Sequence, residues 1–132
     1  MGTRLTNIEK GMIDKLKPIA DKLISDYNLP IHLHFKRIRR GRASYSGYTS
    51  VPLWSLGEGW EYALSYVIHE ITHGIILQTI GQVGHTRAFK EKETEILAEH
   101  NIVPIYSRAY AKMLKNKQGE ILWDKRTSKE LG

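Results

Sequence analysis

The sequence predicts an α+β domain with an N-terminal helix, a small sheet, two further helices and a C-terminal hairpin. Apolar residues recur every three or four positions near the N-terminus and again over residues 60–80, which is typical of helices packed on a core. Residues 31–36 alternate apolar and polar side chains, which is typical of a half-buried strand. Gly and Pro residues separate these segments, as they do at turns.

Composition limits what the protein can be. The chain has 132 residues, of which 41% are hydrophobic, and this suits one core of ordinary size. It has no cysteine and therefore no disulfide. The chain has no run of about 18 apolar residues, and its N-terminus lacks an apolar stretch, so we expect neither a membrane-spanning helix nor a signal peptide. We therefore expect a cytoplasmic protein, which means the host cytoplasm if the source is a virus.

The first helix has recognisable start and stop signals. Thr6 and Glu9 have the spacing of a capping box, which marks a helix N-terminus. Pro18 has no amide hydrogen, so we expect it to kink or split the helix. Residues 28–30, Asn-Leu-Pro, are expected to end it. The apolar residues that keep the helical spacing are Ile8, Met12, Leu16, Ile19, Leu23 and Tyr27.

Two extended segments follow. Residues 31–36 form the first, and residues 44–56 form the second, which Gly47 and Pro52 interrupt in the manner of an edge strand or a bulge. We take residues 48–53 as the sheet edge along which an extended peptide could add main-chain hydrogen bonds. His32 and His34 point to one side of the first strand. No acidic residue or further His lies near them in sequence, so we expect a solvated polar face there.

A metal motif lies inside the predicted helix of residues 60–80. His69 and His73 are four residues apart, so both imidazoles lie on one face of the helix and can bind one ion. Glu70 lies between them, close enough to reach a water on that ion without being a ligand. This pattern is typical of zinc peptidases, in which the two His bind Zn²⁺ and the Glu is the general base. Gly81 is expected to stop the helix.

A catalytic zinc needs a third protein ligand and leaves a fourth position for water. In one class of zinc peptidases the third ligand is a His at a spacing that would fall on position 79. That residue is Thr79 here, so this class is not expected. His85 is the best candidate, because the Gly-rich turn at residues 81–84 can bring the chain back toward the first two His. Thr86 can then cap a helix that runs to about residue 100. The alternatives are Glu95 and Glu99, with His100 a weaker one.

The motif resembles that of a known family. The run His69-Glu70-Ile71-Thr72-His73-Gly74, followed by Gly84-His85-Thr86-Arg87-Ala88-Phe89-Lys90, is similar to the HExxH helix and G-H-x-x-x-F element of SprT-like (SprT/Spartan) zinc metallopeptidases. The resemblance covers roughly residues 8–100 and implies a compact zincin-like core in residues 1–101. It implies His69, His73 and His85 as ligands of one zinc ion, and Glu70 as the catalytic base.

The C-terminal region departs from that family. Many members carry a four-Cys zinc ribbon after the core, whereas this chain has no cysteine. We expect residues 102–132 to form a hairpin and a basic tail packed on the same domain. Two extended segments, 102–114 and 120–123, would be joined by residues 115–119, with Gly119 suited to a positive φ. A helix over residues 107–115 is the alternative.

A cluster of positive charge precedes the second strand. The net charge is +6, and residues 36–42 contain five cations, namely Lys36, Arg37, Arg39, Arg40 and Arg42. Such a patch favours a phosphate backbone through counterion release, although most charge runs are solvated turns. The resemblance adds a reason, since Spartan-type relatives act on proteins bound to DNA. Any such DNA binding should be independent of sequence.

Two functions follow from these patterns. The first is a zinc metallopeptidase acting on a protein or peptide substrate, with DNA as a further partner and no membrane. The second is a nucleic-acid-binding or adaptor module whose zincin core is catalytically silent. Glu70 favours the first, because a purely structural metal site has no use for a base at that position. An oxyanion must also be stabilised, and the sequence leaves the candidates open: Tyr45, Tyr48, Tyr106, Tyr110, His32 and His34.

Overall fold

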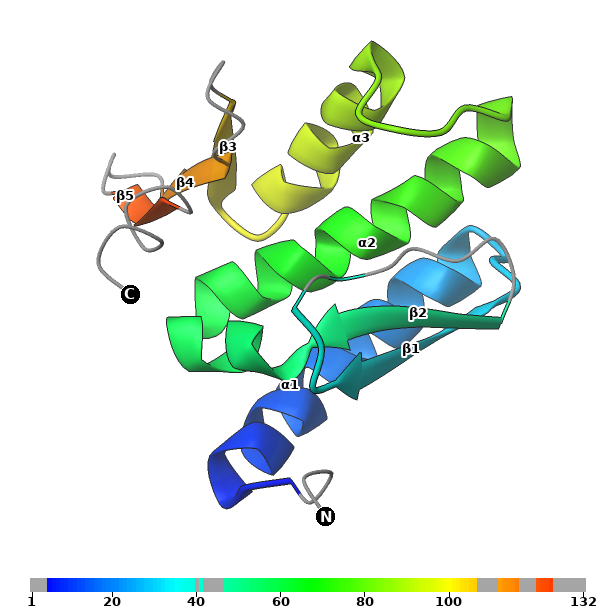
Figure 1. Ribbon diagram of the computed structural model, residues 1–132. Coiled ribbons are helices and arrows are strands. Elements are labelled where there is room, and N and C mark those ends of the chain that lie inside the picture. The colour runs from blue at the N-terminus through cyan, green and yellow to red at the C-terminus, as the bar shows by residue number, and fades with distance from the viewer. Residues whose placement is uncertain (1–4, 40, 42–46, 107–111, 117–120, 125–132) are drawn as a thin grey trace.

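The computed structural model describes residues 5–39, 41, 47–106, 112–116 and 121–124, and it is an α+β structure (Figure 1). The elements in chain order are α1 (Asn7–Asp26), β1 (Ile31–Lys36), β2 (Gly47–Pro52), the 3₁₀ helix η1 (Leu53–Glu58), α2 (Trp60–Ile80), α3 (Arg87–Ala98), β3 (Ile102–Tyr106), β4 (Lys112–Asn116) and β5 (Ile121–Asp124). No helix in the described part of the chain is long and apolar enough to cross a membrane.

The start of α1 confirms the predicted capping box. The Glu9 N–H donates to Thr6 Oγ1 at 3.1 Å, and the Thr6 N–H donates to Glu9 Oε1 at 2.8 Å. The helix runs through Pro18 without interruption, so Pro18 does not split it, and a kink at this residue stays a prediction. Burial of Leu16, Ala20 and other residues on the same face provides tertiary contacts that outweigh the missing hydrogen bond.

The two strands of the first sheet are parallel, with Ile31 opposite Gly47 and Lys36 opposite Pro52. The second extended segment ends earlier than the sequence predicts, because Leu53–Glu58 is the 3₁₀ helix η1. Leu53 and Leu56 are both buried, and a spacing of three places them on one side of a 3₁₀ turn. Ser55 stabilises this turn by donating its hydroxyl hydrogen to the Pro52 carbonyl at 2.8 Å.

Helix α2 is the centre of the molecule. It lies between α3 on one side and α1 with the β1–β2 sheet on the other (Figure 1). Its bounds, Trp60–Ile80, are those predicted from the sequence, and Gly81 ends it with a left-handed φ of 69°. The predicted apolar face of α2 is fully buried, at Leu64, Ile68, Ile71 and Ile75. Gly74 packs on the first sheet, where an added Cβ would lie 3.5 Å from Ile31 Cδ1.

The C-terminal region contains the predicted antiparallel pair and one further strand. Strands β4 and β5 pair antiparallel, as expected for the end of the first segment and residues 120–123, and β3 pairs with β4 on its other side, so the sheet has three strands in the order β3, β4, β5. Residues 112–115, which the alternative placed in a helix, belong to β4 and pair with β3. The predicted segment 102–114 therefore contains parts of two strands, β3 and β4. Its mixed apolar and basic residues gave no sign of the break between them. Strand β3 contacts α3, and β5 contacts α2.

Candidate metal centre

Helix α2 places the first two His of the motif side by side. Because His69 and His73 are one turn apart on the same face, their ring centroids lie 4.9 Å from each other. Both side chains are half-buried. The distance between these two rings follows from the geometry of α2 alone and needs no contact with another element.

The connection between α2 and α3 brings the third imidazole to the same place. Gly81 and Gly84 both have positive φ values, 69° and 83°, which glycine adopts without steric cost and which turn the chain back after α2. His85 then lies with its ring centroid 5.0 Å from that of His69 and 5.0 Å from that of His73. One ring nitrogen from each of the three His falls within 4.8 Å of the others.

The nitrogen positions suit a shared ion. His69 Nε2 and His85 Nε2 are 3.1 Å apart. Two nitrogens bound to one tetrahedral zinc at its usual bond length lie about 3.3 Å apart. The spacing of these two donor atoms is therefore close to that of two ligands on one zinc ion.

A phenyl ring lies against all three imidazoles. Phe89, fully buried in the first turn of α3, is 5.0, 4.3 and 5.1 Å from the ring centroids of His69, His73 and His85. Thr86 starts this helix as predicted, since its hydroxyl accepts the Phe89 N–H at 3.3 Å. Phe89, four residues after His85, therefore has a packing role: its ring forms an apolar surface directly beside the three imidazoles.

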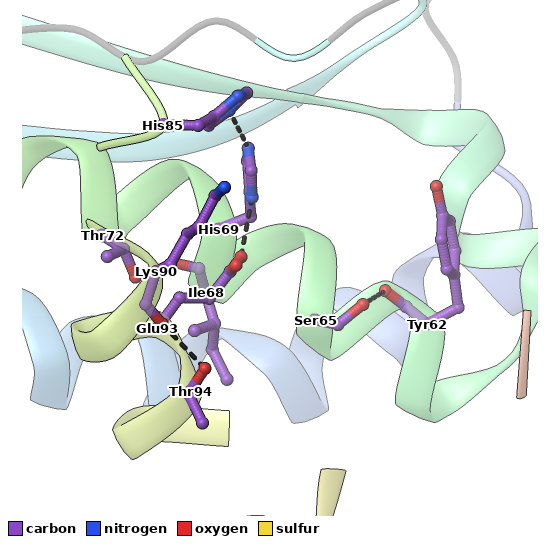
Figure 2. Close-up of polar contacts among 9 residues, drawn as sticks. All are labelled: Tyr62, Ser65, Ile68, His69, Thr72, His85, Lys90, Glu93 and Thr94. Carbon is purple, nitrogen blue, oxygen red and sulfur yellow. Dashed lines mark hydrogen bonds and ion pairs between the residues drawn. The ribbon is translucent and has the colours of Figure 1, made fainter. Parts of the chain in front are cut away.

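A carboxylate that sequence reasoning did not select lies behind the cluster. Glu93 on α3 has no exposed surface, and its Oε2 accepts a hydrogen bond from His69 Nδ1 at 2.7 Å (Figure 2). Figure 2 shows His85, His69 and Glu93 in one line, linked by these two contacts. The signal was present in the sequence as an acidic residue four positions after Phe89, within an apolar stripe of α3 that continues with Ile96 and Leu97.

The alternative third ligands lie elsewhere. Glu95 points to solvent, where it forms an ion pair with Lys92 at 3.2 Å. Glu99 is exposed just after α3, and His100 lies in the turn that follows. The three-residue cluster of the described chain contains none of them. Of the candidates that the sequence left open, the structure brings only His85 to the two His of α2.

Glu70 is buried, with 7% of its surface exposed, and the backbone of Gly41 lies directly against it. A Cβ added to Gly41 would be 2.8 Å from Glu70 Oε2 and 2.7 Å from Tyr66 Cε1. The Gly41 N–H donates to the Tyr66 hydroxyl oxygen at 2.9 Å. Tyr66 is one turn before Glu70 on α2, so both side chains meet the same glycine.

No family model, no curated protein and no solved structure matches this chain. The interpretation of the site therefore depends on its own residues and geometry.

The predicted basic patch is described in part. Arg37 forms a paired contact with Glu9 of α1, with Nη1 to Oε2 at 3.1 Å and Nη2 to Oε1 at 3.0 Å. The Arg39 carbonyl accepts a hydrogen bond from Trp54 Nε1 at 2.9 Å, and Lys36 is exposed. Arg40 and Arg42 lie outside the described residues. Because Arg37 already has a carboxylate partner, it is the least suited of the three described cations to a phosphate. DNA binding by this segment stays a prediction.

Three candidates for oxyanion stabilisation, His32, His34 and Tyr48, lie on the face of the β1–β2 sheet that points away from α2. Ile31 faces α2, so the alternation of β1 puts His32 and His34 on the other face of the sheet. Tyr48 is on that face too, with its ring 4.7 Å from that of His34. His34 Nε2 is 3.0 Å from Ser50 Oγ, and burial, together with the nearby Lys36 charge, lowers the pKa of His34. The expected polar face is thus only partly solvated. Tyr45 and Tyr110 lie outside the described residues.

Proposed function

We propose that this protein is a zinc-dependent metallopeptidase with a zincin-like core of the SprT-like kind. One observation supports the proposal: the imidazoles of His69, His73 and His85 lie close enough together to share one ion, and the buried Glu70 directly follows His69 on α2. Three nitrogen ligands leave one coordination position open for water, which is the arrangement of catalytic zinc sites.

The chemistry of the donors supports zinc. Imidazole nitrogen is a preferred ligand of Zn²⁺, and no thiolate or carboxylate joins the described cluster to favour another metal. His69, His73 and His85 would hold the ion, which would supply Lewis-acid chemistry and a water molecule with a pKa near 7. The chain's own residues must then hold the peptide and move the proton.

We assign the transfer of that proton to Glu70. As general base it accepts a proton from the attacking water, and it then delivers the proton to the amine that leaves when the peptide bond breaks. The backbone of Gly41 lies against its carboxylate and limits where the carboxylate can point. A carboxylate held in one orientation needs less reorganisation in the transition state, which favours catalysis.

The substrate would lie extended next to β2. Among the described strands β2 pairs with β1, and we take its other edge as the place where an extended peptide would add. Such binding recognises the backbone of an unfolded or extended protein segment with little dependence on its side chains. Proteins bound to nucleic acid remain the substrate class that the SprT-like resemblance suggests.

The substitution Glu70→Gln tests the proposal, with Glu61→Gln as a matched control on an exposed position of the same helix. Each zinc-loaded protein is incubated with a library of unstructured peptides, with and without single-stranded DNA, and products are identified by mass spectrometry. Wild type and the control should give the same products, and Glu70→Gln should give none while it retains zinc. Products that persist in Glu70→Gln would contradict the assignment of the base.

The same three proteins test the alternative function, a nucleic-acid-binding or adaptor module without catalytic activity. If all three proteins bind zinc and DNA alike and none cleaves any peptide in either condition, the binding or adaptor module is the better interpretation. Retention of DNA binding together with Glu70-dependent cleavage would instead support a peptidase that works near nucleic acid.

A further inference from the structure

Two carboxylates are buried among the described residues, Glu70 and Glu93. The proposed reaction uses the first and has no step for the second. Burying a carboxylate is unfavourable unless it is paired or hydrogen-bonded, so a residue such as Glu93 needs a physical reason. It sits on the buried face of α3, where its neighbours Phe89, Ile96 and Leu97 are apolar.

The contact between Glu93 and His69 is specific to one nitrogen. Oε2 of Glu93 is 2.7 Å from Nδ1 of His69, a short distance for such a bond. Because the carboxylate can only accept, Nδ1 must carry the hydrogen. The other nitrogen, Nε2, then presents its lone pair, and this is the atom that lies 3.1 Å from His85 Nε2 in the cluster.

We propose that Glu93 is a positioning residue of the metal centre. It selects the His69 tautomer whose Nε2 faces the ion, holds the ring in that orientation, and places a negative charge behind a set of three neutral ligands. This inference rests on the proposed function, since it takes the three imidazoles as zinc ligands. Carboxylates that hold a ligating His in this way raise the basicity of the ligand, and their loss weakens metal binding about 10- to 100-fold.

The role is distinct from simple core packing. Helix α3 supplies Glu93 and starts at Arg87, two residues after His85, so the segment that brings in the third imidazole leads directly into the helix that orients the first. A purely structural Glu93 would affect the stability of the metal-free protein and leave zinc affinity unchanged. A positioning role changes zinc affinity in a protein that is already folded.

The test compares wild type, Glu93→Gln and a matched control, Glu91→Gln. Gln keeps the size of the side chain and an oxygen acceptor but removes the charge. Glu91 is on the same helix with 67% of its side chain exposed, so its substitution should leave the site intact. The dissociation constant for Zn²⁺ alone is measured by competition with a chromophoric chelator, and thermal unfolding of each metal-free protein is recorded.

We expect Glu93→Gln to weaken zinc binding about 10- to 100-fold and Glu91→Gln to remain within about twofold of wild type. An equal zinc dissociation constant in wild type and Glu93→Gln would overturn the proposal. Proton–nitrogen NMR of zinc-loaded wild type gives a second measurement that needs no variant, in case Glu93→Gln does not fold. It should show His69 protonated at Nδ1, and a proton at Nε2 would overturn the proposal.

These outcomes separate the role of Glu93 from the peptidase itself. Zinc affinity that depends on Glu93, in a protein whose peptide products do not depend on Glu70, would reject the peptidase and retain the metal centre. Glu70-dependent cleavage with an unchanged zinc affinity in Glu93→Gln would retain the peptidase and reject the positioning role. A wild type that binds no zinc would reject both.

Discussion

The backbone amide of Gly41 donates a hydrogen bond to the hydroxyl oxygen of Tyr66 at 2.9 Å, and this contact holds Gly41 against the buried Glu70. A second contact lies just before it, from Trp54 Nε1 to the Arg39 carbonyl at 2.9 Å. The rings of Trp54 and Tyr66 pack edge to face at 5.8 Å. Tyr62, whose pKa is raised by burial, packs on both of these rings.

Substitution Gly41→Ala should disturb this contact directly. The φ of Gly41 lies outside the range that disfavours other residues, so the effect is steric: the new methyl would lie under 3.0 Å from both Tyr66 and Glu70. Tyr66 is confined by its aromatic neighbours, and the carboxylate of Glu70 is buried. We expect the free energy of unfolding to fall by about 1–3 kcal/mol. Urea unfolding of the two proteins measures the change.

Gly57→Ala is the control for that experiment. Its added Cβ would meet nothing within 4 Å, and its φ is also compatible with alanine. We expect this variant to be as stable as wild type or slightly more stable, because alanine restricts the unfolded chain. Equal stability of Gly41→Ala and Gly57→Ala would show that the connection moves away from Glu70 without cost.

The variant Tyr66→Phe removes the acceptor of the Gly41 amide and keeps the ring. The loss of one hydrogen bond of this kind should cost about 0.5–1.5 kcal/mol. Hydrogen exchange at the Gly41 amide should become faster, because the backbone there loses its partner. The exposed Tyr48 provides the control substitution, Tyr48→Phe. Unchanged exchange at Gly41 in Tyr66→Phe would mean that another group protects this amide.

Removal of the third imidazole tests the metal centre. Wild type should contain about one zinc ion per chain by elemental analysis, since the three nitrogens converge on one point. His85→Ala should lose most of this zinc, because two His on one helix leave the ion open to solvent. The matching substitution in the exposed strand residue His32 should keep it. Full occupancy in His85→Ala would require a different third ligand.

The ion pair between Glu9 and Arg37 predicts a dependence of stability on pH. Hydrogen bonds from the Arg37 side chain and from the Thr6 amide lower the pKa of Glu9 below its usual 4.5. A carboxyl group whose pKa is lower in the folded state stabilises the protein above its unfolded pKa. That stability is lost as the pH falls through the folded pKa. The pair is partly exposed, so we expect a contribution of about 0.2–1 kcal/mol.

A double-mutant cycle isolates this contribution. Urea unfolding of wild type, Glu9→Gln, Arg37→Ala and the double variant is measured at neutral pH and at several pH values below 4.5. The coupling energy should be present at neutral pH and should vanish in acid. A coupling energy that stays constant down to the lowest pH would place its origin in packing rather than in charge.

Local features of the structure were predictable from the sequence. The capping residues Thr6 and Thr86, the stop at Gly81 and the exact bounds of α2 all depend on neighbours within one or two turns. The 3₁₀ helix at Leu53–Glu58 was missed because a short apolar run with Pro and Gly is equally compatible with a strand. The three-stranded C-terminal sheet was missed because pairing partners are set by contacts between distant segments.

The sequence by itself determined that His69 and His73 share one helix face with Glu70 between them, because a spacing of four residues has that consequence in any α-helix. Only the tertiary structure decided what surrounds them. It brought His85 to the pair in preference to Glu95, Glu99 or His100, and it placed Glu93 behind His69 and Gly41 against Glu70. These last contacts join residues 24 and 29 positions apart, and they depend on how α2 packs against α3 and the β1–β2 connection, which no local periodicity specifies.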